Sequence, residues 1–148
     1  MRVRVLALTG VATITAAVLL TGCGSTPAED LKSWFTSGGD DQIKTLNADA
    51  SGVNHLSMSS TDVLAPACQK LLTHVTAAEK HDPVPDKSAQ GYWSKALASF
   101  KRGASDCTAG ARKRDDQQVY QGVREIQTEG LPELESAVSL IRSGIEAD

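Results

Sequence analysis

Three histidines, His55, His74 and His81, are the side chains that could act as general bases near neutral pH. His74 and His81 are seven residues apart, so one helix face could carry both, and Asp82 and Asp86 follow closely. Two imidazoles with nearby carboxylates are ligands that zinc accepts. The spacing, however, matches no metal-binding motif of the HExxH kind. We therefore predict no metal site and no cofactor.

Motifs for covalent catalysis and for phosphate binding are missing from the sequence. It contains no GxSxG segment, no SxxK segment and no glycine-rich phosphate loop. Two carboxylate pairs, at residues 40–41 and 115–116, stand where helix starts are expected, and capping explains them. The basic run at residues 112–114 is predicted to be a solvated turn, with a small contact patch for a partner as the alternative. These features predict a protein that is not an enzyme.

The first 23 residues have the layout of a bacterial export signal. Arg2 and Arg4 form a basic start, and residues 5–20 form an apolar stretch shorter than the roughly 20 residues that a membrane-spanning helix needs. The segment that closes it, Leu20-Thr21-Gly22-Cys23, resembles the lipobox of bacterial lipoproteins. This resemblance implies that residues 1–22 are a signal peptide removed by signal peptidase II, and that the Cys23 sulfur carries a diacylglycerol.

The chain that remains after this cleavage is acidic. Without residues 1–22, the 148-residue chain has 126 residues, with 13 basic and 18 acidic side chains and a net charge of −5. This balance argues against nucleic acid as a partner and against electrostatic attraction to anionic lipid headgroups. Two acyl chains on one glycerol are sufficient for stable anchoring. We therefore expect a lipid anchor on Cys23 at the extracytoplasmic face of the cell membrane, with an outer membrane as the alternative.

The other two cysteines, Cys68 and Cys107, are an even pair in a chain that carries an export signal. Disulfides form in exported proteins, and neither cysteine is flanked by the cysteine or histidine cluster of a metal site. A reactive thiol is the remaining alternative. We predict a structural disulfide, which closes a loop of about 40 residues and corresponds to roughly 4 kcal/mol in the chain-entropy estimate.

Apolar residues at spacings of three and four predict helices along the mature chain. A capping box formed by Thr26 and Glu29 opens a short helix through Phe35, and glycines 38 and 39 stop it. Longer helices are expected from Asp40 to about Val53, from about Thr61 to Lys80, from Asp86 or Ser88 to about Ala111, and over Val119 to Ile145. Pro66 must then lie in the first turn of its helix or kink it, and Gly130-Leu131-Pro132 must kink or interrupt the last helix.

The predicted fold class is all-α, because no strand-like alternation of useful length occurs. We expect an up-and-down bundle of about four helices with one disulfide between helices. Residues 23–39 are expected to form a lipid-anchored tether with a short helix, and residues 40–148 the bundle domain.

The disulfide restricts how two of these helices face each other. A simple hairpin centred on Val84 would leave Cys68 opposite a position about 10 Å along the axis from Cys107. A disulfide needs Cα atoms within about 7 Å. The later helix should therefore start about two turns beyond the end of the earlier one, with the extended segment 81–86 running back along the overhang. In this register Trp93 packs against Pro83, Val84 or Pro85.

The mature part resembles the small helical lipoproteins of unassigned role from high-GC Gram-positive bacteria. The resemblance rests on Pro-Val-Pro-Asp at residues 83–86, on Tyr92-Trp93 and on the Ala-Ser-Asp-Cys neighbourhood at residues 104–107, and it implies no activity. We expect an exported, lipid-anchored cell-envelope protein that acts as a non-enzymatic binding or interaction module, with a protein partner in the envelope. The alternative is a helical-bundle carrier of a small apolar ligand or a metal. An interaction module should have a filled core and an exposed patch, whereas a carrier should have an enclosed cavity or converging histidines and carboxylates.

Overall fold

The computed structural model describes residues 24–147, and these residues fold into helices. The elements are α1 (Pro27–Trp34), η1 (Phe35–Gly39), α2 (Asp40–His55), α3 (Thr61–Ala78), α4 (Lys87–Lys113), α5 (Asp116–Glu125), η2 (Ile126–Gly130) and α6 (Leu131–Glu146). Of the two segments marked η, η1 is a kink between two helices and η2 is a π-helical turn. No strand occurs in this part of the chain, so the predicted all-α fold class is confirmed. The predicted signal peptide, residues 1–22, and the predicted lipidation site, Cys23, lie outside the described residues.

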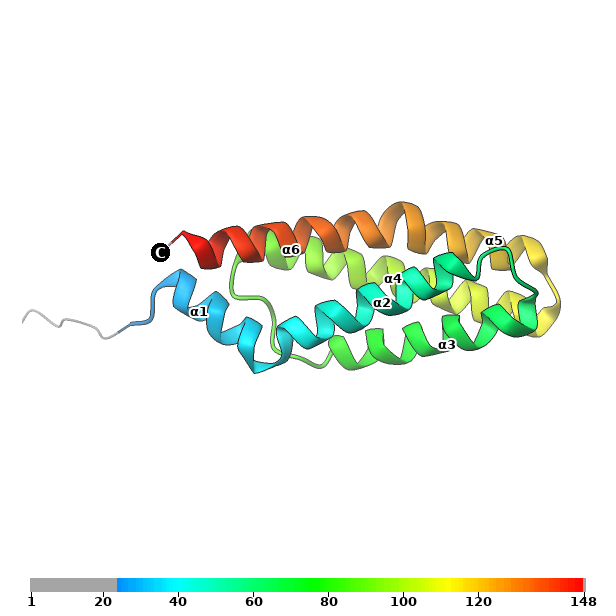
Figure 1. The fold of residues 1–148 in the computed structure, drawn as a ribbon, viewed down its shortest axis with the longest axis horizontal. Coiled ribbons are helices and arrows are strands. Elements are labelled where there is room, and N and C mark those ends of the chain that lie inside the picture. Colours follow the sequence, from blue (N-terminus) through cyan, green and yellow to red (C-terminus); the bar gives the residue numbers. More distant parts are fainter. Residues whose placement is uncertain (1–23, 148) are drawn as a thin grey trace, which may run out of the picture.

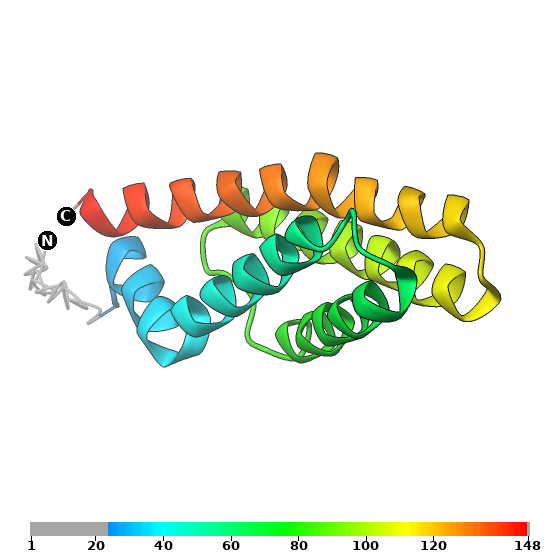
Figure 2. The same cartoon turned by 45° about the vertical axis from the view of Figure 1, so that its right-hand side comes forward.

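The helices form an elongated up-and-down bundle (Figure 1 and Figure 2). α2 and α3 run antiparallel around the turn at residues 56–60, and α4 returns antiparallel to α3. α5, η2 and α6 follow one another as a nearly continuous rod antiparallel to α4. α1 packs beside the C-terminal end of α6, so the first and last described helices meet at one end of the bundle. The turns at residues 56–60 and 114–115 form the opposite end.

α1 begins at the predicted capping box and belongs to the body of the bundle. The Glu29 amide donates to the Thr26 hydroxyl at 3.2 Å, and the Glu29 carboxylate accepts from the Thr26 amide at 2.7 Å. Leu31 and Trp34 are buried in the same core cluster as the long helices. Gly38 has a φ of 127°, which glycine adopts without a steric penalty, and the chain changes direction there before α2.

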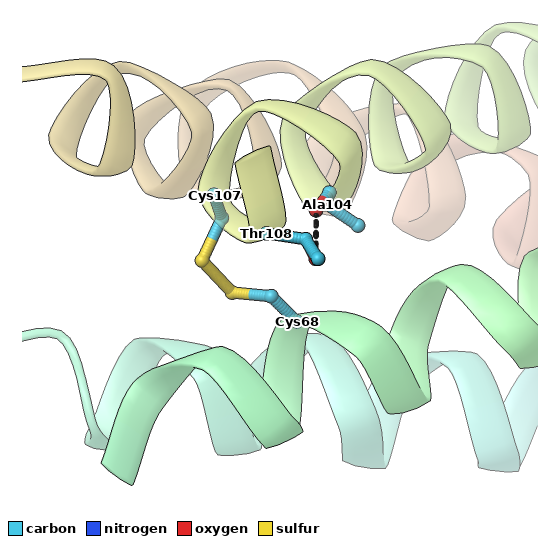
Figure 3. The surroundings of a disulfide bond; sticks show 4 residues. All are labelled: Cys68, Ala104, Cys107 and Thr108. Atoms are coloured by element: carbon cyan, nitrogen blue, oxygen red, sulfur yellow. Dashed lines mark hydrogen bonds between the residues drawn. A yellow bond between two sulfur atoms is a disulfide. The ribbon is translucent and has the colours of Figure 1, made fainter. Parts of the chain in front are cut away.

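A disulfide between Cys68 and Cys107 joins α3 to α4, with Cα atoms 6.1 Å apart (Figure 3). Both cysteines are fully buried. α4 begins beyond the end of α3, and the chain between them runs back along this overhang (Figure 1). Pro83 and Trp93 line the same surface hollow, which agrees with the expected register.

Two prolines occupy helices in different ways. Pro66 lies in the second turn of α3, not in its first turn, because α3 already begins at Thr61. The predicted interruption near Pro132 is the π-helical turn η2, in which the Leu131 amide donates to the Ile126 carbonyl five residues back. Pro132 then stands in the first turn of α6, directly after this wider turn.

α4 and α5 approach each other closely at two glycines, Gly103 and Gly122. A Cβ atom on Gly122 would lie 2.4 Å from the Gly103 carbonyl oxygen, and one on Gly103 would lie 2.6 Å from the Gly122 carbonyl oxygen. Backbone atoms cannot move aside as a flexible side chain can. The contact therefore requires glycine on both helices, and it holds α5 against the turn of α4 that carries Cys107.

We expect Gly122→Ala to lower the free energy of unfolding by about 3 kcal/mol, because the added methyl group would overlap backbone atoms of α4. Urea unfolding followed by circular dichroism measures this change. Gly52→Ala is the matched control, since a Cβ there meets no atom within 4 Å and alanine favours the helix by up to about 1 kcal/mol. Equal effects of the two substitutions would show that α4 and α5 do not pack in this way.

Candidate functional site

The three histidines occupy three separate places in the bundle. His55 is exposed at the C-terminal end of α2. His74 on α3 hydrogen-bonds through Nδ1 to the Asp49 carboxylate. His81 follows α3 and lies edge-on to the Trp34 ring, with ring centroids 5.8 Å apart. Within the described residues, no group of three or more histidine, cysteine or carboxylate side chains is arranged to hold a metal ion.

The acidic residues that follow His81 have structural partners. Asp86 accepts from the Ala89 amide at 2.7 Å and so begins α4, as predicted for a cap. The Asp82 carbonyl accepts from Trp34 Nε1 at 2.7 Å. The Trp34 ring also meets the Trp93 ring edge-on, at 5.8 Å between centroids. These contacts tie α1 to α4 through the segment at residues 81–86.

A buried carboxylate, Asp49, joins α2 to α3, although the sequence did not single it out. Only 7% of Asp49 is exposed; Lys70 Nζ lies 3.0 Å from Oδ1, and His74 bonds to the other oxygen. A carboxylate also orients the histidine of hydrolytic triads. In those triads the other imidazole nitrogen hydrogen-bonds to a hydroxyl or thiol nucleophile. No such hydrogen bond joins His74 to a described residue. The cluster is therefore a bridge between two helices.

A hollow of about 440 Å³ lies at the end of the bundle formed by the turns. Leu64, Val119 and Val123 form its buried apolar floor. Met58 and Tyr120 stand on its rim, with 96% and 66% of their surface exposed. We call the residues that line it the tip surface: Ser57, Met58, Ser59, Ser60, Thr61, Leu64, Asp116, Val119, Tyr120, Val123, Arg124 and Gln127.

Charged side chains surround this apolar rim. Asp116 and Arg124 are exposed members of the tip surface. The basic run at residues 112–114 ends α4 beside it, where Arg112 and Arg114 line a neighbouring open hollow of about 700 Å³. The turn that follows is capped as predicted, because Asp115 accepts from the Gln118 amide at 3.0 Å. A charged border around exposed apolar groups is typical of protein contact surfaces.

The tip surface lies at the end of the bundle opposite to the start of α1 (Figure 1). Its two large exposed apolar residues were not predicted from the sequence. Met58 stands alone in the polar cluster between Leu56 and Thr61, and Tyr120 follows Val119 outside the apolar phase of its helix. The large apolar side chain of Met58 in a polar turn is the sequence signal that could have identified this surface.

Among the residues that the structure describes, no helix is both long enough and apolar enough to span a bilayer. Comparisons of the chain with protein-family models, with curated proteins and with solved structures gave no match.

Proposed function

We propose that this protein is an exported, lipid-anchored component of the cell envelope that acts as a non-enzymatic interaction module. Its anchor is the lipid on Cys23, and its tip surface contacts a protein. The observation that carries the proposal is the exposed pair Met58 and Tyr120 over an apolar floor, at the end of the bundle opposite to the start of α1 (Figure 1). A chain tethered at its N-terminus would direct this end away from the tether.

The packing of the bundle favours a module over a carrier. The side chains that meet along its axis are fully buried, among them Leu71, Phe100 and Ile141. The tip hollow opens to solvent, and the disulfide bridges α3 and α4 within the core (Figure 3). A carrier needs an enclosed cavity or converging ligands. An exposed tyrosine beside apolar surface, in contrast, is a common anchor of protein contacts.

Position-specific photocrosslinking in intact cells tests the contact at the tip surface. The chain has two tyrosines, Tyr120 at the tip and Tyr92 on α4, and each can be replaced by a photoreactive phenylalanine analogue. Tyr92 is 38% exposed and serves as the matched control. Because only the tip is proposed to meet a protein, irradiation should give a discrete protein adduct from position 120 and none from position 92.

Two results would contradict the proposal. One is equal adduct formation from both tyrosine positions, which would indicate random collision. The other is no adduct from position 120 in cells where the protein is membrane-bound. Substituting Met58 by serine in the same experiment should weaken the adduct without changing stability by more than about 0.5 kcal/mol, because the side chain is almost fully exposed.

A further inference from the structure

We propose that the tip surface binds a second copy of this chain, about a two-fold axis that passes close to Tyr120. This inference rests on the proposed function, because it names the protein that the tip surface meets. It is carried by the order of three exposed side chains along α5, together with the apolar rim beside them.

Asp116, Tyr120 and Arg124 form one row on α5. They are spaced by four residues, so they lie on one side of the helix, and all three line the tip hollow. Each charged residue is about 6 Å along the axis from Tyr120, one on either side. The row therefore has an acid at one end, an aromatic ring in the middle and a base at the other end.

This row is complementary to itself when a second copy is turned by 180°. If two α5 helices lie antiparallel with Tyr120 facing Tyr120, Asp116 of each copy faces Arg124 of the other. One rotation thus forms two ion pairs from a single surface, as an isologous interface requires. In a parallel pair, acid would face acid and base would face base, which costs several kcal/mol. The charges therefore select the antiparallel dimer.

The groups needed for this contact are free to make it. The ion pairs within the described residues involve other side chains, and neither Asp116 nor Arg124 takes part in one. Met58 beside Tyr120 supplies exposed apolar surface, and the hollow over Leu64 has room for part of the Tyr120 ring of the second copy. Tyrosine at the centre and charges at the rim match the usual distribution of affinity and specificity in protein interfaces.

Membrane anchoring would favour such a dimer. Because α5 runs along the length of the bundle (Figure 1), a two-fold axis along the membrane normal lays both bundles along the membrane surface. Both N-termini are then at the same height, so both lipids can enter one bilayer. Confinement to a surface also raises the effective concentration of one copy around another. A dimer with a small interface can then form in the cell.

Disulfide crosslinking of the full chain in intact cells tests the axis. Tyr120→Cys removes the ring but keeps the two ion pairs between Asp116 and Arg124, and mild oxidation traps each encounter covalently. Because the same residue of two copies meets at the axis, this variant should give a covalent dimer, whereas Tyr92→Cys should not. Cys68 and Cys107 do not interfere, since both are buried in the native disulfide. Absence of the Tyr120→Cys dimer in membranes that contain the protein would overturn the inference.

Charge reversal in the Tyr120→Cys background tests the pairing. Arg124→Asp alone and Asp116→Arg alone should each reduce the dimer at least about tenfold, because like charges then face each other twice. Co-expression of these two variants with different tags should restore the dimer, and only between different tags. This recovery also shows that both variants fold. A yield of covalent dimer that stays the same after the charge substitutions would overturn the inference.

The outcomes separate this inference from the proposed function. A photo-adduct from position 120 with a different protein, combined with no covalent dimer, overturns the second copy as occupant but leaves the interaction module supported. Failure of both experiments overturns both. A covalent dimer that is lost in each charge variant and restored on co-expression, together with a photo-adduct of twice the protein's mass, supports both.

Discussion

Replacing Cys68 and Cys107 together by alanine is expected to lower the free energy of unfolding by about 4 kcal/mol. The two cysteines are 39 residues apart in sequence, so the bridge removes a large loop-closure entropy from the unfolded chain. Both positions are fully buried in the native core, and alanine introduces no unpaired polar group there. The loss is large beside the roughly 5–15 kcal/mol that stabilise a domain in total.

Urea unfolding of the oxidised protein, of the reduced protein and of the double variant measures this effect. Reduction should shift the unfolding midpoint of the wild type almost as far as the double substitution does. The double variant itself should not respond to reductant. If reductant leaves the wild-type midpoint unchanged, the bridge contributes no stability and the loop-closure account is wrong.

Local patterns predicted most of the fold. The capping box at Thr26 and the cap at Asp86 set helix starts that the structure confirms, because both depend on side chains that bond to amides three residues away. Trp93, Phe100 and Cys107 of α4 belong to the apolar residues at spacings of three and four that predicted this helix, and all three are buried. The disulfide then fixed the offset of α4 against α3, since a covalent bond leaves little choice of register.

Contacts between helices were harder to predict. Gly103 and Gly122 each look like a weak helix residue in sequence, and only their mutual approach explains them. The buried Asp49 carboxylate is paired with Lys70 and His74, which reach it from another helix, and no local sequence pattern indicates such partners. The tip surface is likewise assembled from a turn before α3 and from α5, which lie far apart in sequence. Residues 1–23 lie outside the described residues, so the lipid anchor stays a prediction.

Cys23→Ser is expected to abolish lipidation and the processed, membrane-bound form of the protein. A serine hydroxyl does not replace the thiol that accepts the diacylglycerol in a lipobox, and signal peptidase II acts on the lipidated chain. The variant should therefore keep residues 1–22 and carry no fatty acid. Metabolic labelling with a clickable fatty acid, together with the size of the product in membrane and soluble fractions, measures both changes.

If residues 1–22 are removed as proposed, the remaining chain offers no second electrostatic attachment, and this makes the Cys23 test decisive. Its net charge of −5 repels anionic headgroups, whereas burial of acyl chains contributes about 0.8 kcal/mol per CH₂ group and does not depend on salt. Washing membranes with concentrated salt should therefore leave the wild type in place. The Cys68→Ala/Cys107→Ala variant is the matched cysteine control and should still take up the fatty acid label. A Cys23→Ser protein that is cleaved and retained like the wild type would exclude the lipid anchor, because the attachment would then have to come from another part of the chain.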